Sequence, residues 1–159
     1  MTGTLGAAGI ALLALSRKIP ASIEIMNALY EPFPRITEGI ALARSRAVTS
    51  MMDISDGLAM SLHDLGKAGN VGFKIYESRL PVLSNVDGFI HEELLDAAIF
   101  SGGDFVLLFT VDPDMLQCAK EACHLTVIGE VIQEGFFIDR YGRADKLEAR
   151  GYEHFGNKD

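Results

Sequence analysis

The chain has 159 residues, about the length of one domain, and 48% of them are apolar, which favours a folded core over disorder. Its formal net charge of -8 argues against a nucleic-acid backbone or an anionic membrane as the main partner, although acidic groups can still recruit magnesium. The apolar run over residues 5–15 is too short to span a bilayer and has no basic segment before it, so we expect a soluble, cytoplasmic protein.

Alternating helical and strand patterns cover most of the chain. The spacing of apolar residues predicts helices over residues 7–17, 21–29, 38–46, 58–67, 90–100 and 113–123. Apolar and β-branched runs predict strands over residues 48–53, 71–76, 105–109, 126–131 and 136–139. The irregular alternation predicts a single α/β (α+β) domain over residues 1–159, with a mixed sheet of about four or more strands packed with helices.

Local signals refine several of these elements. Thr37 and Ser55 are predicted to cap the helices that follow them, and Asp112, with a proline after it, is predicted to cap another. The uniformly apolar run over residues 105–109 predicts a central strand of the sheet. Residues 133–135 predict a hairpin-like turn between the last two strands.

The most informative segment is the turn over residues 53–57, which separates a strand from a helix. Asp53 and Asp56 place two carboxylates here, with the Ser55 hydroxyl between them and Gly57 at the start of the helix. Carboxylates suit a helix N-terminus, and two together are typical ligands of a hard cation such as magnesium. The alternative is a pair of capping acids with no ligand, and the spacing alone does not separate the two interpretations.

Two further turns carry glycines at positions where ligands often bind. Gly3-Thr4-Leu5-Gly6 precedes a helix and can hold a phosphate on backbone N–H groups, although an ordinary start of a helix is the simpler explanation. Ser101-Gly102-Gly103-Asp104 lies next to a buried-looking strand, and ligands in α/β folds gather at strand ends. For a lone Gly-Gly-Asp, plain turn chemistry is again the simpler interpretation.

The order and wording of these motifs resemble one family. In sequence, the matching pieces are Thr2-Gly3-Thr4-Leu5-Gly6, Pro32-Phe33-Pro34-Arg35, Met52-Asp53-Ile54-Ser55-Asp56-Gly57-Leu58, Ser101-Gly102-Gly103-Asp104 with Leu107-Leu108-Phe109-Thr110, Ile128-Gly129-Glu130-Val131 and Gly151-Tyr152-Glu153-His154-Phe155. The Asp-Ile-Ser-Asp-Gly-Leu string is the most specific of them. On these motifs the chain resembles the C-terminal domain of thiamine-monophosphate kinase, within the superfamily that includes aminoimidazole ribonucleotide (AIR) synthase.

The resemblance implies a role in ATP-dependent phosphoryl transfer. It implies that the family's N-terminal ATP-binding domain is absent, and that this chain is the phosphate- and substrate-side domain of a kinase. The expected reaction converts thiamine monophosphate, a small phosphorylated molecule, to thiamine diphosphate with ATP and magnesium. The implied site residues are Asp56 as catalytic residue, Asp53 and Asp56 as metal ligands, Thr4, Gly6 and Ser55 as phosphate or nucleotide contacts, and Gly102, Gly103, Asp104, Tyr152 and Phe155 as substrate contacts. Because phosphoryl transfer depends on positioning and charge neutralisation, no general base is expected.

Departures from the kinase pattern keep alternatives open. The kinase usually reads Gly-Gly-Glu-Asp-Tyr-Glu-Leu-Leu-Phe, whereas residues 102–109 lack one acidic residue and have Val106 in place of a glutamate. The chain is also expected to need an N-terminal partner domain for activity. The alternatives are an AIR synthase-related ligase or cyclase domain and a non-catalytic ligand-binding module. Without the partner domain, apolar surface on the first helix and on residues 107–109 is expected to promote self-association into a homo-oligomer.

Overall fold

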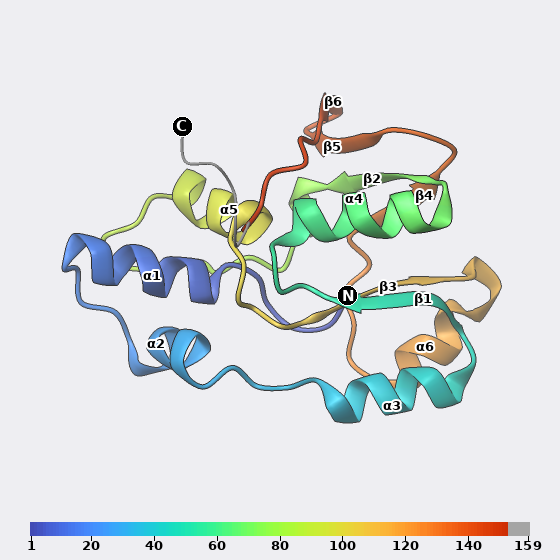
Figure 1. Cartoon of the computed structure of the whole chain (residues 1–159), viewed down its shortest axis with the longest axis horizontal. Coiled ribbons are helices and arrows are strands. Elements are labelled where there is room, and N and C mark those ends of the chain that lie inside the picture. The colour runs from blue at the N-terminus through green and yellow to red at the C-terminus, as the bar shows by residue number, and fades with distance from the viewer. Residues whose placement is uncertain (153–159) are drawn as a thin grey trace.

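Two β-sheets organise the chain in the computed structural model, which describes residues 1–152 (Figure 1). The first sheet pairs β1 (Val48–Asp53) antiparallel with β3 (Leu107–Val111). The second has the order β4-β2-β5-β6 and consists of β2 (Gly72–Tyr76), β4 (Gly129–Ile132), β5 (Phe136–Arg140) and β6 (Arg143–Lys146). Because β2 pairs antiparallel with β4 and parallel with β5, the predicted mixed sheet is confirmed.

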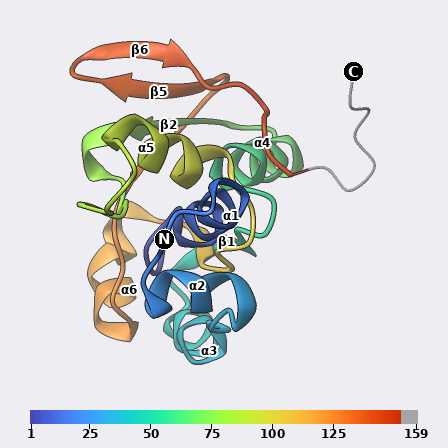
Figure 2. The ribbon, with the colours of Figure 1, turned by 90° about the vertical axis from the view of Figure 1, so that its left-hand side faces the viewer.

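Helices cover both sheets. Within residues 1–152 they are α1 (Ala7–Arg17), α2 (Ile23–Tyr30), α3 (Ile36–Ser45), α4 (Leu58–Gly69), α5 (His91–Phe100) and α6 (Leu116–Ala122). Figure 1 shows α4 lying across the four-stranded sheet, with α3 and α6 on the far side of the β1–β3 pair. Seen from the side, α1 and α2 lie on the near end of the molecule, and the β5–β6 hairpin forms its outer edge (Figure 2). In the part of the chain that the structure describes, no helix is long and apolar enough to cross a membrane.

The main hydrophobic core lies between α4, α5 and the two sheets. Its fully buried side chains include Leu58 and Leu62 of α4, Ile75 of β2, Ile99 of α5 and Ile138 of β5. Spacing of three and four residues puts the apolar residues of α4 on one face, which is the reason that this helix packs so completely. A second core cluster packs α3 and α6 against the β1–β3 pair, through Leu42, Ala119 and Phe109.

The strand predicted over residues 105–109 is displaced. The structure places it at Leu107–Val111 and at an edge, because among the described strands β3 pairs with β1 alone. Phe105 has a φ of 49° and bends the chain before the strand begins. The run is apolar for a different reason: Leu108 faces the main core and Phe109 faces the second cluster, so both faces of the strand are buried without a central position.

The hairpin predicted at residues 133–135 is wrong. β4 and β5 pair with opposite edges of β2, so the turn between them crosses the end of β2. Gly72 makes that crossing possible, since a Cβ there would lie 2.3 Å from the Gly135 carbonyl oxygen. β6 was not predicted; it is a short, mostly exposed strand that pairs with β5 and carries charged residues.

The helix caps differ from prediction in two of three places. Gly57, with a φ of 102°, is the N-cap residue of α4, so Ser55 does not cap it. Arg35 precedes α3, which begins one residue before the predicted cap Thr37. Asp112 is confirmed as a cap, because its carboxylate accepts the backbone N–H two residues on at 2.9 Å. The predicted helix behind it is divided into a 3₁₀ turn (Pro113–Met115) and α6.

Candidate functional site

Backbone hydrogen bonds join the acidic turn to the Gly-Gly-Asp turn. The Gly103 N–H donates to the Ser55 carbonyl at 2.9 Å, and the Phe105 N–H donates to the Ile54 carbonyl at 3.1 Å. The Asp104 side chain then reaches the third predicted turn, at the start of α1. The fold therefore brings together the three predicted turns, although successive turns are about fifty residues apart along the chain.

Two glycines allow this close contact. A Cβ on Gly102 would lie 2.3 Å from the Ser55 carbonyl oxygen, a distance that side-chain carbons do not reach. Gly57 has a φ of 102°, and a Cβ there would lie 3.0 Å from the Phe100 carbonyl oxygen. Any side chain at Gly102 would push the two turns apart, so this position has a structural role whether or not a ligand also touches it.

Asp104 caps α1 from a distant part of the chain. Its Oδ2 accepts the Gly6 N–H at 2.7 Å and its Oδ1 accepts the Ala8 N–H at 3.2 Å. Burial raises the pKa of Asp104 above its ordinary value, and the hydrogen bonds from the helix amides partly offset that rise. The carboxylate thus lies at the helix N-terminus where the sequence predicted a phosphate. The predicted phosphate contact of Gly6 and substrate contact of Asp104 stay predictions.

The glycine loop still offers backbone donors next to this cap. The Thr2 N–H donates to β3, and the Leu5 N–H donates to the Pro81 carbonyl at 2.9 Å, so the loop is fixed at both ends. Within residues 1–152, the amides of Gly3 and Thr4 donate to no other group. Thr4 is exposed, and Gly3, with a φ of 63°, is partly exposed. These two amides are better placed to bind an anion than the Gly6 amide, which already donates to Asp104.

Arg35 adds a fixed positive charge beside the loop. Its Nη2 lies 3.0 Å from the position of a Cβ built on Gly3, so the guanidinium touches the loop. Its Nη1 donates to Glu38 at 3.1 Å, and its buried Nε has no hydrogen-bond partner among the described residues. Arginine is well suited to bind phosphate. Arg35 was not among the predicted site residues, although its place in the Pro32–Arg35 motif was the available signal.

The carboxylates of Asp53 and Asp56 are exposed at the end of β1. In the described part of the chain, no group of three or more acidic, histidine or cysteine side chains is placed to hold a metal ion. Magnesium in phosphoryl-transfer sites commonly takes one or two protein carboxylates together with substrate phosphates and water. The two aspartates fit part of such a site, and further ligands would have to come from outside residues 1–152.

The C-terminal segment is attached to the acidic turn. The Tyr152 N–H donates to the Asp56 carbonyl at 2.9 Å. Gly151 permits the contact, since a Cβ there would lie 2.3 Å from the same carbonyl oxygen. The Tyr152 side chain, predicted to contact substrate, therefore starts beside Asp56 and is 57% exposed. The other predicted aromatic contact, Phe155, lies outside the described residues.

The chain belongs to the family described as AIR synthase related protein, C-terminal domain, which matches residues 1–140. Thiamine-monophosphate kinase from Methanospirillum hungatei JF-1 is 38% identical over 154 residues, which are 97% of this chain and 48% of the relative. The kinase from Pyrococcus abyssi is 35% identical over 157 residues, with the same two shares. The chain spans about half the length of the curated relatives it matches, and the predicted resemblance to the C-terminal half of thiamine-monophosphate kinase is confirmed.

Solved structures agree on the fold. Thiamine-monophosphate kinase from Stenotrophomonas maltophilia K279a superposes with a TM-score of 0.74 at 27% identity, over 86% of this chain and 48% of that one. AaThiL complexed with AMPPCP and TMP superposes with a TM-score of 0.73 at 30% identity, over 97% and 50%. Escherichia coli HypE, a hydrogenase maturation protein, reaches a TM-score of 0.77 at 24% identity, which shows a shared fold alone.

Proposed function

We propose that this chain is the phosphate- and substrate-side half of an ATP-dependent kinase that phosphorylates thiamine monophosphate, acting with an N-terminal half of the same fold family. The observation that carries the proposal is the convergence of three turns. Backbone hydrogen bonds join the acidic turn to the Gly-Gly-Asp turn, and the Asp104 side chain joins that turn to the glycine loop. Arg35 beside the glycine loop supplies a positive charge, and the exposed residues Asp53 and Asp56 supply negative charges at the acidic turn. The kinases at 35–38% identity support this function over others of the fold.

The chain's own groups act by binding and orientation. The amides of Gly3 and Thr4, with the Arg35 guanidinium, bind phosphate oxygens and hold them in place. Asp53 and Asp56 are the residues that would hold magnesium, which neutralises charge on the transferred phosphoryl group. A phosphate oxygen of thiamine monophosphate forms the new bond to Pγ of ATP while the bond from Pγ to the β–γ bridging oxygen breaks, and ADP leaves. The attacking oxygen is already anionic, so no general base is needed.

A chimeric enzyme tests the proposal. This chain replaces the C-terminal half of the Methanospirillum hungatei kinase, and thiamine diphosphate formation is measured with ATP and magnesium. We expect turnover, and we expect Asp56→Asn to lower kcat by about 100-fold because the magnesium that Asp56 would hold no longer neutralises the negative charge on the transferred phosphoryl group. Asp87→Asn, at an exposed loop position, is the matched control and should leave the rate unchanged. A folded chimera that binds ATP and forms no product would contradict the proposal.

One observation favours a second candidate, an AIR synthase-related ligase or cyclase. The acidic side chain of the Gly-Gly-Asp turn is engaged as a helix cap, and Val106, which stands in place of a glutamate of the kinase pattern, is buried. The residues expected to line the acceptor site therefore differ from those of the kinase pattern. Product analysis of the same chimera separates the two reactions, since a kinase leaves the phosphate on the acceptor and a synthase releases it as inorganic phosphate. Binding without turnover of either kind would indicate a non-catalytic module.

A further inference from the structure

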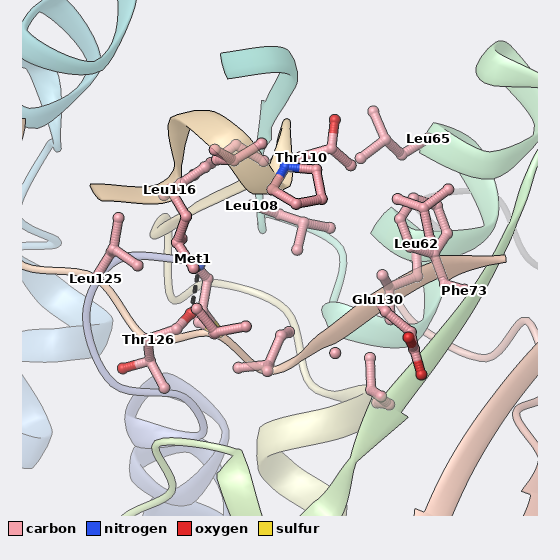
Figure 3. Close-up of a pocket in the computed structure, with 18 residues that line it drawn as sticks. Met1, Leu62, Leu65, Phe73, Leu108, Thr110, Leu116, Leu125, Thr126 and Glu130 are labelled. Atoms are coloured by element: carbon pink, nitrogen blue, oxygen red, sulfur yellow. Dashed lines mark hydrogen bonds between the residues drawn. The ribbon is translucent and has the colours of Figure 1, made fainter. Parts of the chain in front are cut away.

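A cavity of about 490 Å³ separates β3 from β4 (Figure 3). Its walls are mainly apolar and include Leu62, Phe73, Leu108, Leu116 and Ile128. Figure 3 shows Met1 in the wall of this space beside Thr126, with Leu108 and Thr110 of β3 on one side and Glu130 of β4 on the other. The cavity therefore lies between the edges of the two sheets. Its apolar walls would be part of the hydrophobic core if a further element filled it.

Within residues 1–152, both strand edges that face the cavity lack a partner strand. Among the described strands, β3 pairs with β1 alone and β4 with β2 alone. The Tyr76 N–H donates to the Ile128 carbonyl, and bonds in an antiparallel ladder fall on every second residue. The backbone groups of Gly129 and Val131 consequently point away from β2. The same alternation, set by the bond from Ile54 to Val106, turns those of Phe109 and Val111 away from β1.

The first two residues already fill one end of this gap as a strand would. The Met1 nitrogen donates to the Thr126 carbonyl at 2.9 Å, and the Thr126 N–H donates back to the Met1 carbonyl at 2.9 Å. On the other side, the Thr2 N–H donates to the Leu107 carbonyl at 2.9 Å. One extended backbone thus bonds both edges, so the gap at this end is one strand wide. The reciprocal pair with Thr126 is an antiparallel arrangement. Because Thr126 bonds Met1 whereas Ile128 bonds β2, the alternation is interrupted between these two residues, and the groups of β4 that point away from β2 are those of Gly129 and Val131.

We propose that the cavity receives a β-strand from the N-terminal half of the kinase fold, in line with Met1 and antiparallel to the segment that leads into β4. The strand would join the two sheets into one, in the order β1-β3-strand-β4-β2-β5-β6. The inference rests on the proposed function for the identity of the occupant, because the matched kinases are about twice as long as this chain. The geometry rests on the hydrogen bonds of Met1 and Thr2.

The cavity also defines the chemistry of the strand. Four of the five residues of β3 line it, so a strand of about five residues, at roughly 3.3 Å each, spans it. Met1 and Thr2 are 3% and 1% exposed, so side chains on both faces of the incoming strand will be buried. Strands buried on both faces are rich in valine, isoleucine and other apolar residues. We therefore expect an uncharged, β-branched strand.

An N-terminal extension of the full chain tests the proposal directly. One variant carries six alternating valine and threonine residues before Met1, and its matched control carries the same residues with two threonines replaced by proline, which cannot donate to a ladder. Hydrogen exchange is followed at Phe109, Val111, Gly129 and Val131. We expect at least about tenfold slower exchange at these four amides in the alternating variant alone, together with a higher Tm.

Equal exchange at the four amides in both variants would overturn the proposal. Protection that appears in the unextended chain and increases with protein concentration would overturn it in favour of a second copy of this chain in the cavity. Neither readout involves ATP. An inactive chimera with a protected cavity would therefore count against the proposed function and leave the strand intact, and an active chimera with an unprotected cavity would do the reverse.

Discussion

Asp104→Ala tests whether the carboxylate that links the Gly-Gly-Asp turn to α1 stabilises the fold. The substitution removes the acceptors of the Gly6 and Ala8 amides, at 2.7 and 3.2 Å. Loss of a helix cap costs about 0.5–2 kcal/mol, and unsatisfied donors near the core add to that. Burial disfavours the charged carboxylate and raises the pKa of Asp104. The net stabilisation by this side chain is therefore smaller than the sum of two charged hydrogen bonds. We expect a loss of about 2 kcal/mol, or about 4–8 °C in Tm for a domain of this size.

Thermal and urea unfolding of the purified chain measure the effect. Asp104→Asn keeps one acceptor oxygen and should lose about half as much, roughly 1 kcal/mol. Asp87→Ala removes an exposed carboxylate from a loop and should stay within about 0.5 kcal/mol of the original. If Asp104→Ala unfolds at the original midpoint while the chimera loses thiamine monophosphate binding, the capping role is refuted and a direct substrate contact takes its place.

Three further predictions follow from the same geometry. Gly102→Ala should destabilise the chain by about 1–3 kcal/mol in urea unfolding because its Cβ would meet a carbonyl oxygen at 2.3 Å, whereas Gly39→Ala, with its nearest contact at 3.5 Å, should not; equal stability of the two would contradict the packing described. Arg35→Ala should raise the KM of the chimera for its phosphorylated substrate about 10-fold or more, with Arg44→Ala as an exposed control; an unchanged KM would remove Arg35 from the site. In a protein that begins at Met1, burial lowers the pKa of the α-amino group from 8.0 to about 6, so its contribution to stability is present above pH 8 and is lost as the pH falls through about 6. N-terminal acetylation should abolish this part of the pH dependence of unfolding, and an unchanged profile would show that the amino group is not buried.

Local sequence signals predicted much of the fold. Helical spacing located α1, α4 and α5 to within a few residues, because the apolar face of each helix is encoded within a few turns. The strand, acidic turn and helix over residues 48–69 were predicted in the right order, and the acidic turn does adjoin the Gly-Gly-Asp turn. The cap was misassigned because the hydroxyl of Ser55 is a common signal, whereas the φ of 102° at Gly57 depends on contact with α5.

Features that depend on distant contacts were not predictable in this way. Asp104 and Gly6 are 98 residues apart, and nothing local to either residue indicates that one caps the other. The contact of Arg35 with the loop at Gly3 likewise appears only after α1 and α3 are placed. The pairing of β4 and β5 with β2 instead of with each other has the same origin, since a short glycine turn is compatible with both arrangements.

Transfer of labelled γ-phosphate from ATP to thiamine monophosphate by the chimeric enzyme tests the central claim most directly. The convergence of the three turns predicts that the label appears in thiamine diphosphate, and that Asp56→Asn reduces the rate by about 100-fold while Asp87→Asn does not. A chimera that is folded and binds both substrates, yet leaves the label in ATP or releases it as inorganic phosphate, would contradict the assignment of this chain as half of a thiamine-monophosphate kinase.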